Sequence, residues 1–421
     1  MVELQNAKGT KDINVEEKIQ INKVINIITE VFEKYGFNPL QTPILERYET
    51  LSSKYAGGAE ILKETFKLND QGDRDLGLRY DLTVPLSRYI AMNPNLKMPF
   101  KRYELGEAFR DGPIKPGRYR QFTQCDADVM GSKSMLADAE CLAIASEVFS
   151  KLNFKYIIKV NSRKILDAIL EAFDIPEDKR ETVILSIDKL EKIEISGVKK
   201  ELSEKGFKNL DKMLNLIFTN DLNDIKKIVK NQEGIDEINE VLKYCKLLNV
   251  KNLEFDVSLA RGLSYYTGTV FEAFAKNSKI ASSIAGGGRY DKMIGDFIGN
   301  REIPAVGISF GIDTILDVIK DTLKKEEIKT VTEFYLIPIN ALDESIKVLQ
   351  KLRDNNFKCD IDLNSRSISK NLEYANSLGV KNVIFIGKEE LKQDKIKLRD
   401  METGKEKLLS VTELVLKFKK F

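Results

Sequence analysis

The chain of 421 residues contains no histidine, and this absence limits its chemistry more than any other feature of its composition. Without an imidazole, Ser-His-Asp and Cys-His nucleophilic catalysis are excluded, together with histidine-ligated zinc and histidine general bases. Any reaction carried out by this protein must therefore depend on carboxylates, arginine, lysine, tyrosine, hydroxyls or thiols.

Cysteine is scarce, and long apolar runs are missing. The four cysteines occur singly and far apart, without C-x-x-C spacing, so the sequence predicts neither a disulfide framework nor a metal site. This favours a reducing compartment, and we expect a cytoplasmic protein. No segment is apolar enough to cross a membrane, and the N-terminus MVELQNAKGTKD lacks the features of a targeting signal. The net charge of +2 means that any basic surface for nucleic acid must be local.

The remaining composition, 42% hydrophobic and 31% charged, is typical of a globular protein with two or three domains. Changes in pattern along the chain predict an α+β protein with an interrupted core. Strand and helix patterns alternate in the first part of the chain, and a region rich in Lys, Glu, Leu and Ile at helical spacing follows. Strand patterns then return, and a polar linker separates them from a final β-α alternation. The predicted parts are a core at 1–161 and 251–322, a helical insertion at 162–250, a linker at 323–331 and a small α/β domain with a mostly parallel sheet at 332–421.

The most unusual stretch is residues 102–131, which the pattern predicts to be a hairpin. One strand ends at Phe109, a loop rich in Gly and Pro follows, and a second strand runs from Tyr119 to about Met130. Alternation places polar and charged side chains on one face of the second strand, namely Arg120, Gln124, Asp126 and Asp128, together with Phe122. A solvated charged hairpin and the floor of a ligand site both fit this pattern.

Three further segments carry candidate residues. The glycine run 286–288 in AGGGRYD predicts a turn that allows close approach to a ligand, although an ordinary hairpin turn explains it equally well. Arg261 in ARGLSYYTG lies at a predicted strand end, where most arginines are surface charges. In RYDLTVP, spacing places Asp81 and Thr83 on one side of a strand, and Thr83 could also cap the following helix.

Taken together, these segments closely resemble the histidyl-tRNA synthetases, a family of class II aminoacyl-tRNA synthetases. The matching motifs follow the family's order over nearly the whole chain: GTKD, TPILE, LRYDLTVP, FRDG, GRYRQFTQCDAD, RGLSYYTG, GGGRYD and PAVGISFGID. The resemblance implies an antiparallel-sheet catalytic core, an inserted helical domain and a C-terminal α/β anticodon-binding domain. It also implies ATP-dependent activation of L-histidine, transfer to tRNA(His), and a homodimer with the TPILE segment at its interface.

The resemblance assigns roles to individual residues. Arg110 and Arg261 match catalytic arginines on either side of the ATP α-phosphate, with Thr314 also at the ATP site and Mg²⁺ bridging the phosphates. The residues that match the histidine pocket are Asp81, Thr83, Gln124, Asp128, Tyr265, Tyr266 and Tyr290. Lys115, Arg118 and Arg120 are expected to contact phosphates of ATP or tRNA, although simple solvation explains Lys115 equally well.

Three positions depart from the family's pattern, and one of them is Ser264, which stands where an acid is common in the RGL-x-YY motif. Gly112 stands where the hairpin normally carries a glutamate, and Thr314 stands where an arginine normally holds the γ-phosphate. One hypothesis is that Arg289 supplies the missing cation. The alternative function is a catalytically inactive paralogue that acts as a regulatory or tRNA-sensing binding protein. Residues 332–421 argue against the regulatory form, which lacks this domain, and the absence of an effector domain argues against the sensor.

Overall fold

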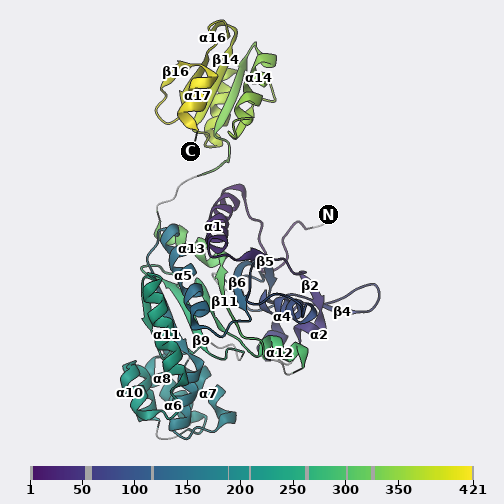
Figure 1. Cartoon of the computed structure of the whole chain (residues 1–421). Helices are drawn as coiled ribbons and strands as arrows, with labels where there is room; N and C mark the ends of the chain where they lie inside the picture. Colours follow the sequence, from purple (N-terminus) through teal and green to yellow (C-terminus); the bar gives the residue numbers. More distant parts are fainter. Residues whose placement is uncertain are drawn as a thin grey trace. The chain divides into compact units, whose positions relative to one another are not determined.

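The computed structural model describes residues 3–52, 59–114, 118–187, 189–207, 210–260, 265–299, 302–323 and 328–419 (Figure 1). The chain divides into two compact units, one of residues 1–12 and 23–324 and the other of residues 13–22 and 325–421. Among the described residues, no helix is both long and apolar enough to cross a membrane.

The first unit is built on an eight-stranded sheet with the order β1-β5-β6-β11-β10-β9-β7-β8. Neighbouring strands are antiparallel except at the two edges, where β1 pairs with β5 and β7 pairs with β8 in parallel. The strands are β1 Asn38–Pro39, β5 Phe100–Phe109, β6 Gln121–Met130, β7 Tyr156–Ser162, β8 Leu253–Phe255, β9 Thr269–Ala275, β10 Ala285–Arg289 and β11 Ala305–Gly311.

Strands β5 and β6 form the predicted hairpin, which is confirmed with a small shift of its second strand. Because β6 begins at Gln121, Arg120 lies outside the strand. The register places Arg102 opposite Asp128 and Glu104 opposite Asp126. Charged residues of both strands therefore share one face of the sheet.

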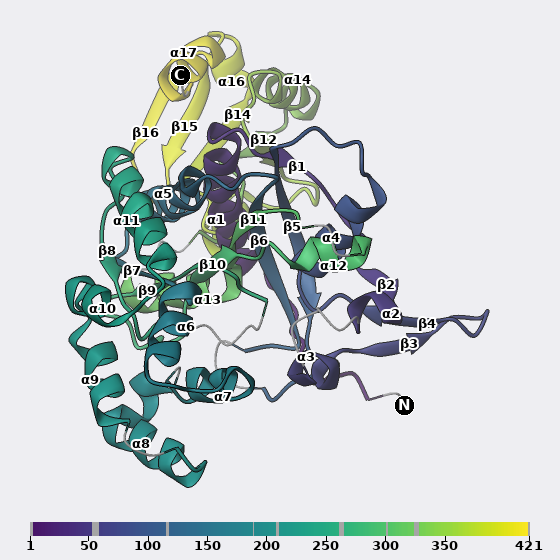
Figure 2. The ribbon, with the colours of Figure 1, turned by 60° about the horizontal axis from the view of Figure 1, so that its bottom comes forward.

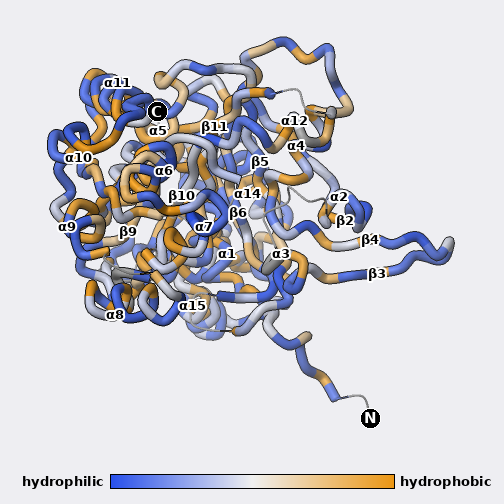
Figure 3. Tube along the Cα trace, turned by 90° about the horizontal axis from the view of Figure 1, so that it is seen from below, coloured by the Kyte–Doolittle hydropathy of each residue, from blue (hydrophilic) through white to orange (hydrophobic). Residues whose placement is uncertain are grey.

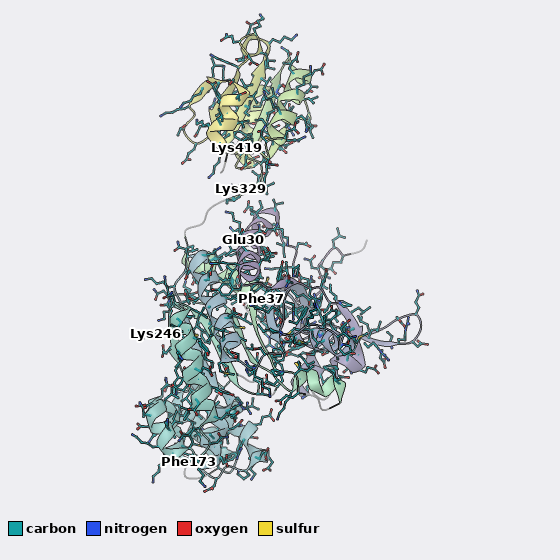
Figure 4. The ribbon with its side chains drawn as sticks, in the orientation of Figure 1. Glu30, Phe37, Phe173, Lys246, Lys329 and Lys419 are labelled. Carbon is teal, nitrogen blue, oxygen red and sulfur yellow. The ribbon has the colours of Figure 1, made fainter. Side chains whose placement is uncertain are left out.

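The opposite face of the sheet is apolar. The ring of Phe310 on β11 lies 5.8 Å from Phe32 of α1 (Val15–Lys34) and 5.6 Å from Phe149 of α5 (Met135–Leu152). Helix α5 buries apolar residues at helical spacing, and at its start the Ser134 hydroxyl accepts a hydrogen bond from Leu136 N. Phe37, labelled in Figure 4, belongs to the same core. One face of the sheet thus packs against helices, and the other face carries polar groups.

A small second sheet, β2-β4-β3, lies beside the hairpin and projects as a largely hydrophilic arm in Figure 3. Its strands are β2 Leu45–Arg47, β3 Lys67–Asn69 and β4 Asp75–Leu78, and the nearby helices are α2 Tyr48–Leu51, α3 Ala59–Glu64, α4 Thr83–Met92 and α12 Met293–Ile298. The prediction that Asp81 and Thr83 lie on a strand is wrong. Thr83 is the first residue of α4, and Asp81 Oδ1 accepts hydrogen bonds from the main-chain nitrogens of Thr83 and Val84. The capping carboxylate is therefore Asp81, two residues before the helix.

Helices fill the stretch between β7 and β8, and Figure 2 shows them grouped together. They are α6 Arg163–Ala172, α7 Glu177–Ile187, α8 Leu190–Glu204, α9 Asp211–Thr219, α10 Leu222–Ile228 and α11 Glu233–Leu247. Their formation follows from apolar residues at helical spacing: in α6, Ile165, Ile169 and their neighbours are buried. Figure 4 labels Phe173 just after α6 and Lys246 in the last turn of α11.

The glycine run 286–288 is not a turn, contrary to expectation. It forms most of strand β10, which pairs with β9 on one side and β11 on the other. A Cβ at Gly287 would overlap the carbonyl oxygen of Gly307 and lie 2.8 Å from the Phe271 ring. Glycine is required here because two neighbouring strands and a ring approach the backbone closely. Helix α13 (Ile312–Thr322) then follows β11 directly.

The second unit contains a five-stranded sheet with the order β13-β12-β14-β15-β16. Its strands are β12 Phe334–Ile339, β13 Cys359–Ile361, β14 Asn382–Gly387, β15 Ile396–Asp400 and β16 Glu406–Leu409, and its helices are α14 Leu342–Arg353, α15 Ile368–Ser377, α16 Lys388–Leu391 and α17 Val411–Phe418. The prediction of a mostly parallel sheet is wrong, because β14-β15 and β15-β16 are antiparallel. Two apolar clusters, centred on Leu336 and on Tyr335, cover the two faces of β12.

Candidate active site

A cavity of about 720 Å³ lies over the polar face of the eight-stranded sheet. It brings together most of the residues that the sequence predicted. Those lining it are Asp81, Thr83, Arg110, Arg118, Gln124, Asp128, Tyr265, Tyr266, Tyr290 and Thr314. Arg120 is not among them, and Arg261 and Lys115 lie outside the described residues.

Strands β6 and β11 form the floor of this pocket, and their alternation determines which side chains face it. Gln124, Asp126 and Asp128 face the cavity, and their register partners on β11 are Gly311, Ser309 and Gly307. Gly307 leaves room for a ligand and for Asp128, because a Cβ at this position would overlap Asp128 Oδ1. We call the part around Asp126 and Asp128 the carboxylate end of the pocket.

Asp128 is held by two protein groups. Its Oδ1 accepts a hydrogen bond of 2.5 Å from the Tyr290 hydroxyl, and its Oδ2 lies 2.9 Å from Arg102 Nη2. Burial raises the pKa of Asp128, while the Arg102 charge and the tyrosine hydrogen bond act against that rise. Oδ1 of Asp128 is therefore hydrogen-bonded within the protein, and Oδ2 is balanced by the charge of Arg102.

Asp126 is the pocket residue that the site prediction missed. It is only 2% exposed, it lines the cavity, and its Oδ1 has no hydrogen-bond partner among the described residues. Burial, followed by the neighbouring Asp128 charge, raises its pKa to about 8. The alternation of β6 placed Asp126 on the correct face, and that was the only signal in the sequence for its role.

A chain of buried charges lies behind the carboxylate end. Arg102 Nη1 is 3.6 Å from Glu104 Oε2, and Arg79 Nη1 is 2.8 Å from Glu104 Oε1. Glu104 also accepts a hydrogen bond of 2.9 Å from the main-chain nitrogen of Thr42. Burial opposes the charge of Arg102, but the facing carboxylates of Asp128, Asp126 and Glu104 raise its pKa overall. Removing one partner of such a network would leave an uncompensated buried charge. Breaking the pairs is therefore costly, and Arg102 and Glu104 keep Asp128 in position.

Arg110 defines the other end of the pocket, which we call the arginine end. Its guanidinium lies 4.2 Å from the Tyr80 ring centroid and 4.7 Å from that of Phe122, while its Nε donates to the Tyr80 carbonyl at 3.3 Å. Two rings therefore hold the guanidinium plane between them. Arg118, whose side chain is 48% exposed, also lines this end and pairs with Glu64 at 3.1 Å.

Glu64 occupies the space next to Gly112, where the family resemblance led us to expect a glutamate. A Cβ at Gly112 would lie 2.6 Å from Glu64 Oε1, and Asp111 N donates to the Glu64 carbonyl at 2.7 Å. A carboxylate is thus present beside the hairpin loop, but it comes from α3. Arg120 turns away toward this loop, with its Nη2 2.9 Å from Asp111 Oδ1.

The hypothesis that Arg289 compensates for Thr314 is wrong. The Arg289 side chain is 2% exposed and pairs with the buried carboxylate of Asp138 on α5 and with Asp291 at 3.3 Å. Its Nη1 also donates to the Ser132 carbonyl at 3.0 Å. Every polar edge of this guanidinium faces protein, so Arg289 fastens α5 to the sheet instead of reaching the cavity.

A metal ion would have to be shared with a bound ligand. Among the described residues, no group of three acidic, cysteine or histidine side chains could hold a metal ion. Mg²⁺ usually binds through one or two carboxylates together with substrate phosphates. Glu272 and Asp313 line the pocket and fit this requirement.

A mainly antiparallel sheet with a long charged pocket on one face, an inserted group of helices and a separate α/β unit together define a class II aminoacyl-tRNA synthetase. The comparisons with known proteins agree. The histidyl-tRNA synthetase family model matches residues 9–315, and an anticodon binding domain model matches residues 333–421. The chain belongs to the histidyl-tRNA synthetase family.

Its relatives are similar over their full length. The chain is 43% identical to histidine–tRNA ligase 1 of Bacillus cereus, across 98% of this chain and 99% of that protein. It is 36% identical to histidine–tRNA ligase of Clostridium tetani, across 97% and 96% of the two chains. A crystal structure of histidyl-tRNA synthetase from Nostoc sp. PCC 7120 superposes with a TM-score of 0.89 at 29% identity, covering 99% of each chain.

Proposed function

We propose that this chain is an active histidine–tRNA ligase that binds L-histidine at the carboxylate end of the pocket and the phosphates of ATP at its arginine end. The observation that carries this proposal is the spacing of the two ends along one strand. Phe122, beside Arg110, and Asp128 are six residues apart on β6, a rise of about 20 Å. A histidine joined end to end with a nucleotide's phosphates spans a pocket of this kind.

The first step joins the histidine carboxylate to the ATP α-phosphate and releases pyrophosphate. The substrate's own carboxylate is the nucleophile, so the protein needs to position the reactants and balance charge and does not need a nucleophile of its own. Arg110 supports the α-phosphate with a guanidinium that two rings hold in place, and Arg261 is its expected counterpart. Mg²⁺, held by phosphate oxygens with Glu272 or Asp313, would supply further positive charge when bound.

Selection of histidine follows from the carboxylate end. Asp126 has an oxygen without a hydrogen-bond partner among the described residues, so it accepts the imidazole N–H, with Asp128 and Tyr290 forming the wall beside it. Gln124 donates from Nε2 to Ser309 at 2.7 Å, which leaves its amide oxygen to accept from the α-ammonium group. Asp81, Thr83, Tyr265 and Tyr266 also line the pocket and are proposed to complete the histidine site. A side chain without an N–H would leave a buried acceptor unpaired, which costs about 1–3 kcal/mol.

The second step transfers the histidyl group from the adenylate to the terminal adenosine of tRNA(His) and releases AMP. The match of residues 333–421 to an anticodon-binding domain supports a role for the second unit in holding that RNA. Lys115, Arg118 and Arg120 are proposed to contact RNA or ATP phosphates beside the hairpin. We further propose a cytoplasmic homodimer, with the domain limits that the sequence predicted.

The alternative is a catalytically inactive paralogue. The ligase names of relatives that cover 96% or more of both chains favour the active enzyme. The two readings differ in one measurement, histidine-dependent ATP–pyrophosphate exchange by the purified protein. We expect exchange that requires histidine and Mg²⁺. A protein that binds tRNA but shows no exchange at saturating ATP would disprove the proposal.

A further inference from the structure

Lys11, in the N-terminal segment, reaches the wall of the pocket at its arginine end. Its ammonium nitrogen lies 3.7 Å from Asp313 Oδ1 and 4.6 Å from the centroid of the Tyr119 ring. Asp313 and Tyr119 both line the cavity, and Asp313 is followed directly by Thr314. The ammonium therefore lies at the same wall as the position that lacks an arginine.

Main-chain contacts fix this placement. The nitrogen of Arg120 donates to the Gly9 carbonyl at 3.0 Å, and Thr10 N donates to the Ala7 carbonyl at 3.0 Å, which forms a turn docked on the hairpin. Gly9 has φ of 86°, and a Cβ there would lie 2.7 Å from the Arg120 side chain. Because the backbone just before Lys11 is tied to the hairpin, the lysine is presented to the pocket and is not carried by a loose terminus.

The charges at this end suit a third cation. A nucleoside triphosphate carries several negative charges, and the arginines among the described residues that line the cavity are Arg110 and Arg118. Arg118 is half exposed and shares its charge with Glu64, while Thr314 contributes only a hydroxyl group. Lysine is a compact charge on a flexible stem with three N–H donors, so it can hold Asp313 and a phosphate oxygen together.

We propose that Lys11 binds the β- and γ-phosphates of ATP and thereby supplies the cation that Thr314 lacks. This inference rests on the proposed function, because it assumes that ATP phosphates occupy the arginine end. The proposal predicts that Lys11 distinguishes nucleotides by the length of their phosphate chain. Removing the lysine weakens binding of a triphosphate and leaves binding of a monophosphate unchanged.

The test measures the affinities of the full-length protein for α,β-methylene-ATP and for AMP by calorimetry. Lys11→Met is expected to weaken binding of the triphosphate analogue about tenfold, the effect of losing one charged hydrogen bond, with AMP affinity unchanged. Lys11→Arg is expected to retain the affinity. Lys8→Met removes a lysine of the same segment, which is exposed, and is expected to leave both affinities unchanged.

A second variant distinguishes a binding role from a structural one. Adding Thr314→Arg to Lys11→Met is expected to restore the preference for the triphosphate, because it returns a cation to the same wall. Equal loss of affinity for both nucleotides without recovery in the double variant would overturn the inference, as would an unchanged affinity in Lys11→Met. If Lys11→Met loses affinity for the analogue as expected but the wild-type protein shows no pyrophosphate exchange, the proposed function alone is overturned.

Discussion

The two larger sheets of this protein, with eight and five strands, use their faces in opposite ways. In the second unit, both faces of β12 are apolar, with Leu336 and Tyr335 buried in clusters on either side. In the first unit, one face of the large sheet packs against α1 and α5, while the other face carries Arg102, Glu104 and Asp128, each less than 4% exposed. Both sheets are well buried, but only one is buried with charge.

This difference distinguishes a sheet that serves as a scaffold from a sheet that carries the functional site. Burying a charge is costly unless it is paired, so a sheet that serves only as a scaffold has no reason to retain one. Arg102 of β5 pairs with Glu104 and Asp128, whereas Asp126 Oδ1 lies at the cavity without a hydrogen-bond partner among the described residues. The Gln124 amide oxygen also lacks a partner there, so the site is marked by buried polar groups on β6 that the protein leaves open to a ligand.

The largest expected effect is that of Arg110→Ala. Removing the guanidinium held by Tyr80 and Phe122 should lower histidine-dependent pyrophosphate exchange about a thousandfold, because preorganised charge at the α-phosphate is lost. The matched control is Arg399→Ala on β15 of the other sheet, which should leave exchange unchanged. If both variants showed equal exchange, the charged face of the first sheet would have no special role in the reaction.

Gly307→Ala should follow, with exchange reduced about a hundredfold. The added methyl group would overlap Asp128 Oδ1 and push that carboxylate away from Tyr290. Gly387→Ala is the control in the second sheet, where the new methyl group would crowd the end of the Glu390 side chain and make ordinary contact with Ile339. A Gly307→Ala enzyme with the wild-type KM for histidine would show that the floor tolerates this crowding.

Asp126→Asn should raise the KM for histidine about tenfold while the KM for ATP stays within twofold of wild type. The amide keeps the shape of the carboxyl group but replaces one of its oxygens with an NH₂ group, which cannot accept a hydrogen bond from the imidazole N–H. Kinetics with each substrate varied in turn provide the measurement. A rise in KM for ATP of equal size would assign Asp126 to the support of the whole pocket.

The same substitution should change how stability depends on pH. The folded pKa of Asp126 is about 8, above the ordinary 3.8, so the folded state retains a proton that the unfolded chain loses between about pH 4 and 8. Wild-type stability from this group is fully present below about pH 4 and falls as pH rises toward 8. The melting temperature of Asp126→Asn relative to wild type should therefore increase from pH 5 to pH 8. A constant difference across this range would contradict the assigned ionisation.

Leu336→Ala should have the smallest effect on exchange. Leu336 is fully buried in β12, and its truncation should destabilise the second unit by about 3 kcal/mol. Exchange without tRNA should remain at the wild-type level, whereas aminoacylation should fail at a lower temperature. Calorimetry and the two activity assays compare these outcomes, and a parallel loss of both activities would show that adenylate formation depends on the second unit.

Sequence reasoning succeeded where the signal was local. Alternation placed the polar face of β6 correctly from Phe122 onward. The family resemblance indicated the α+β class and most of the pocket. These features depend on residues that are close together in the chain.

It failed where the cause lies far away in sequence. The glycines of β10 form a strand because the Gly307 carbonyl and the Phe271 ring approach them, and turn propensity gives no hint of this. Arg289 was offered as a ligand contact because nothing near it shows that Asp138, on α5, neutralises it. Asp81 was assigned to a strand because its capping of α4 depends on a turn that the two-residue spacing does not reveal.

The absence of histidine around the buried carboxylates of the pocket has a spectroscopic consequence. Since the chain has no histidine, a bound substrate would contribute the only imidazole of the binary complex. Its ring carbon-bound protons would give NMR signals in a region where the protein adds no imidazole signals of its own. A pH titration of the complex would thus measure how the pocket changes the protonation of the bound imidazole, and its comparison with Asp126→Asn would test the proposed contact with Asp126.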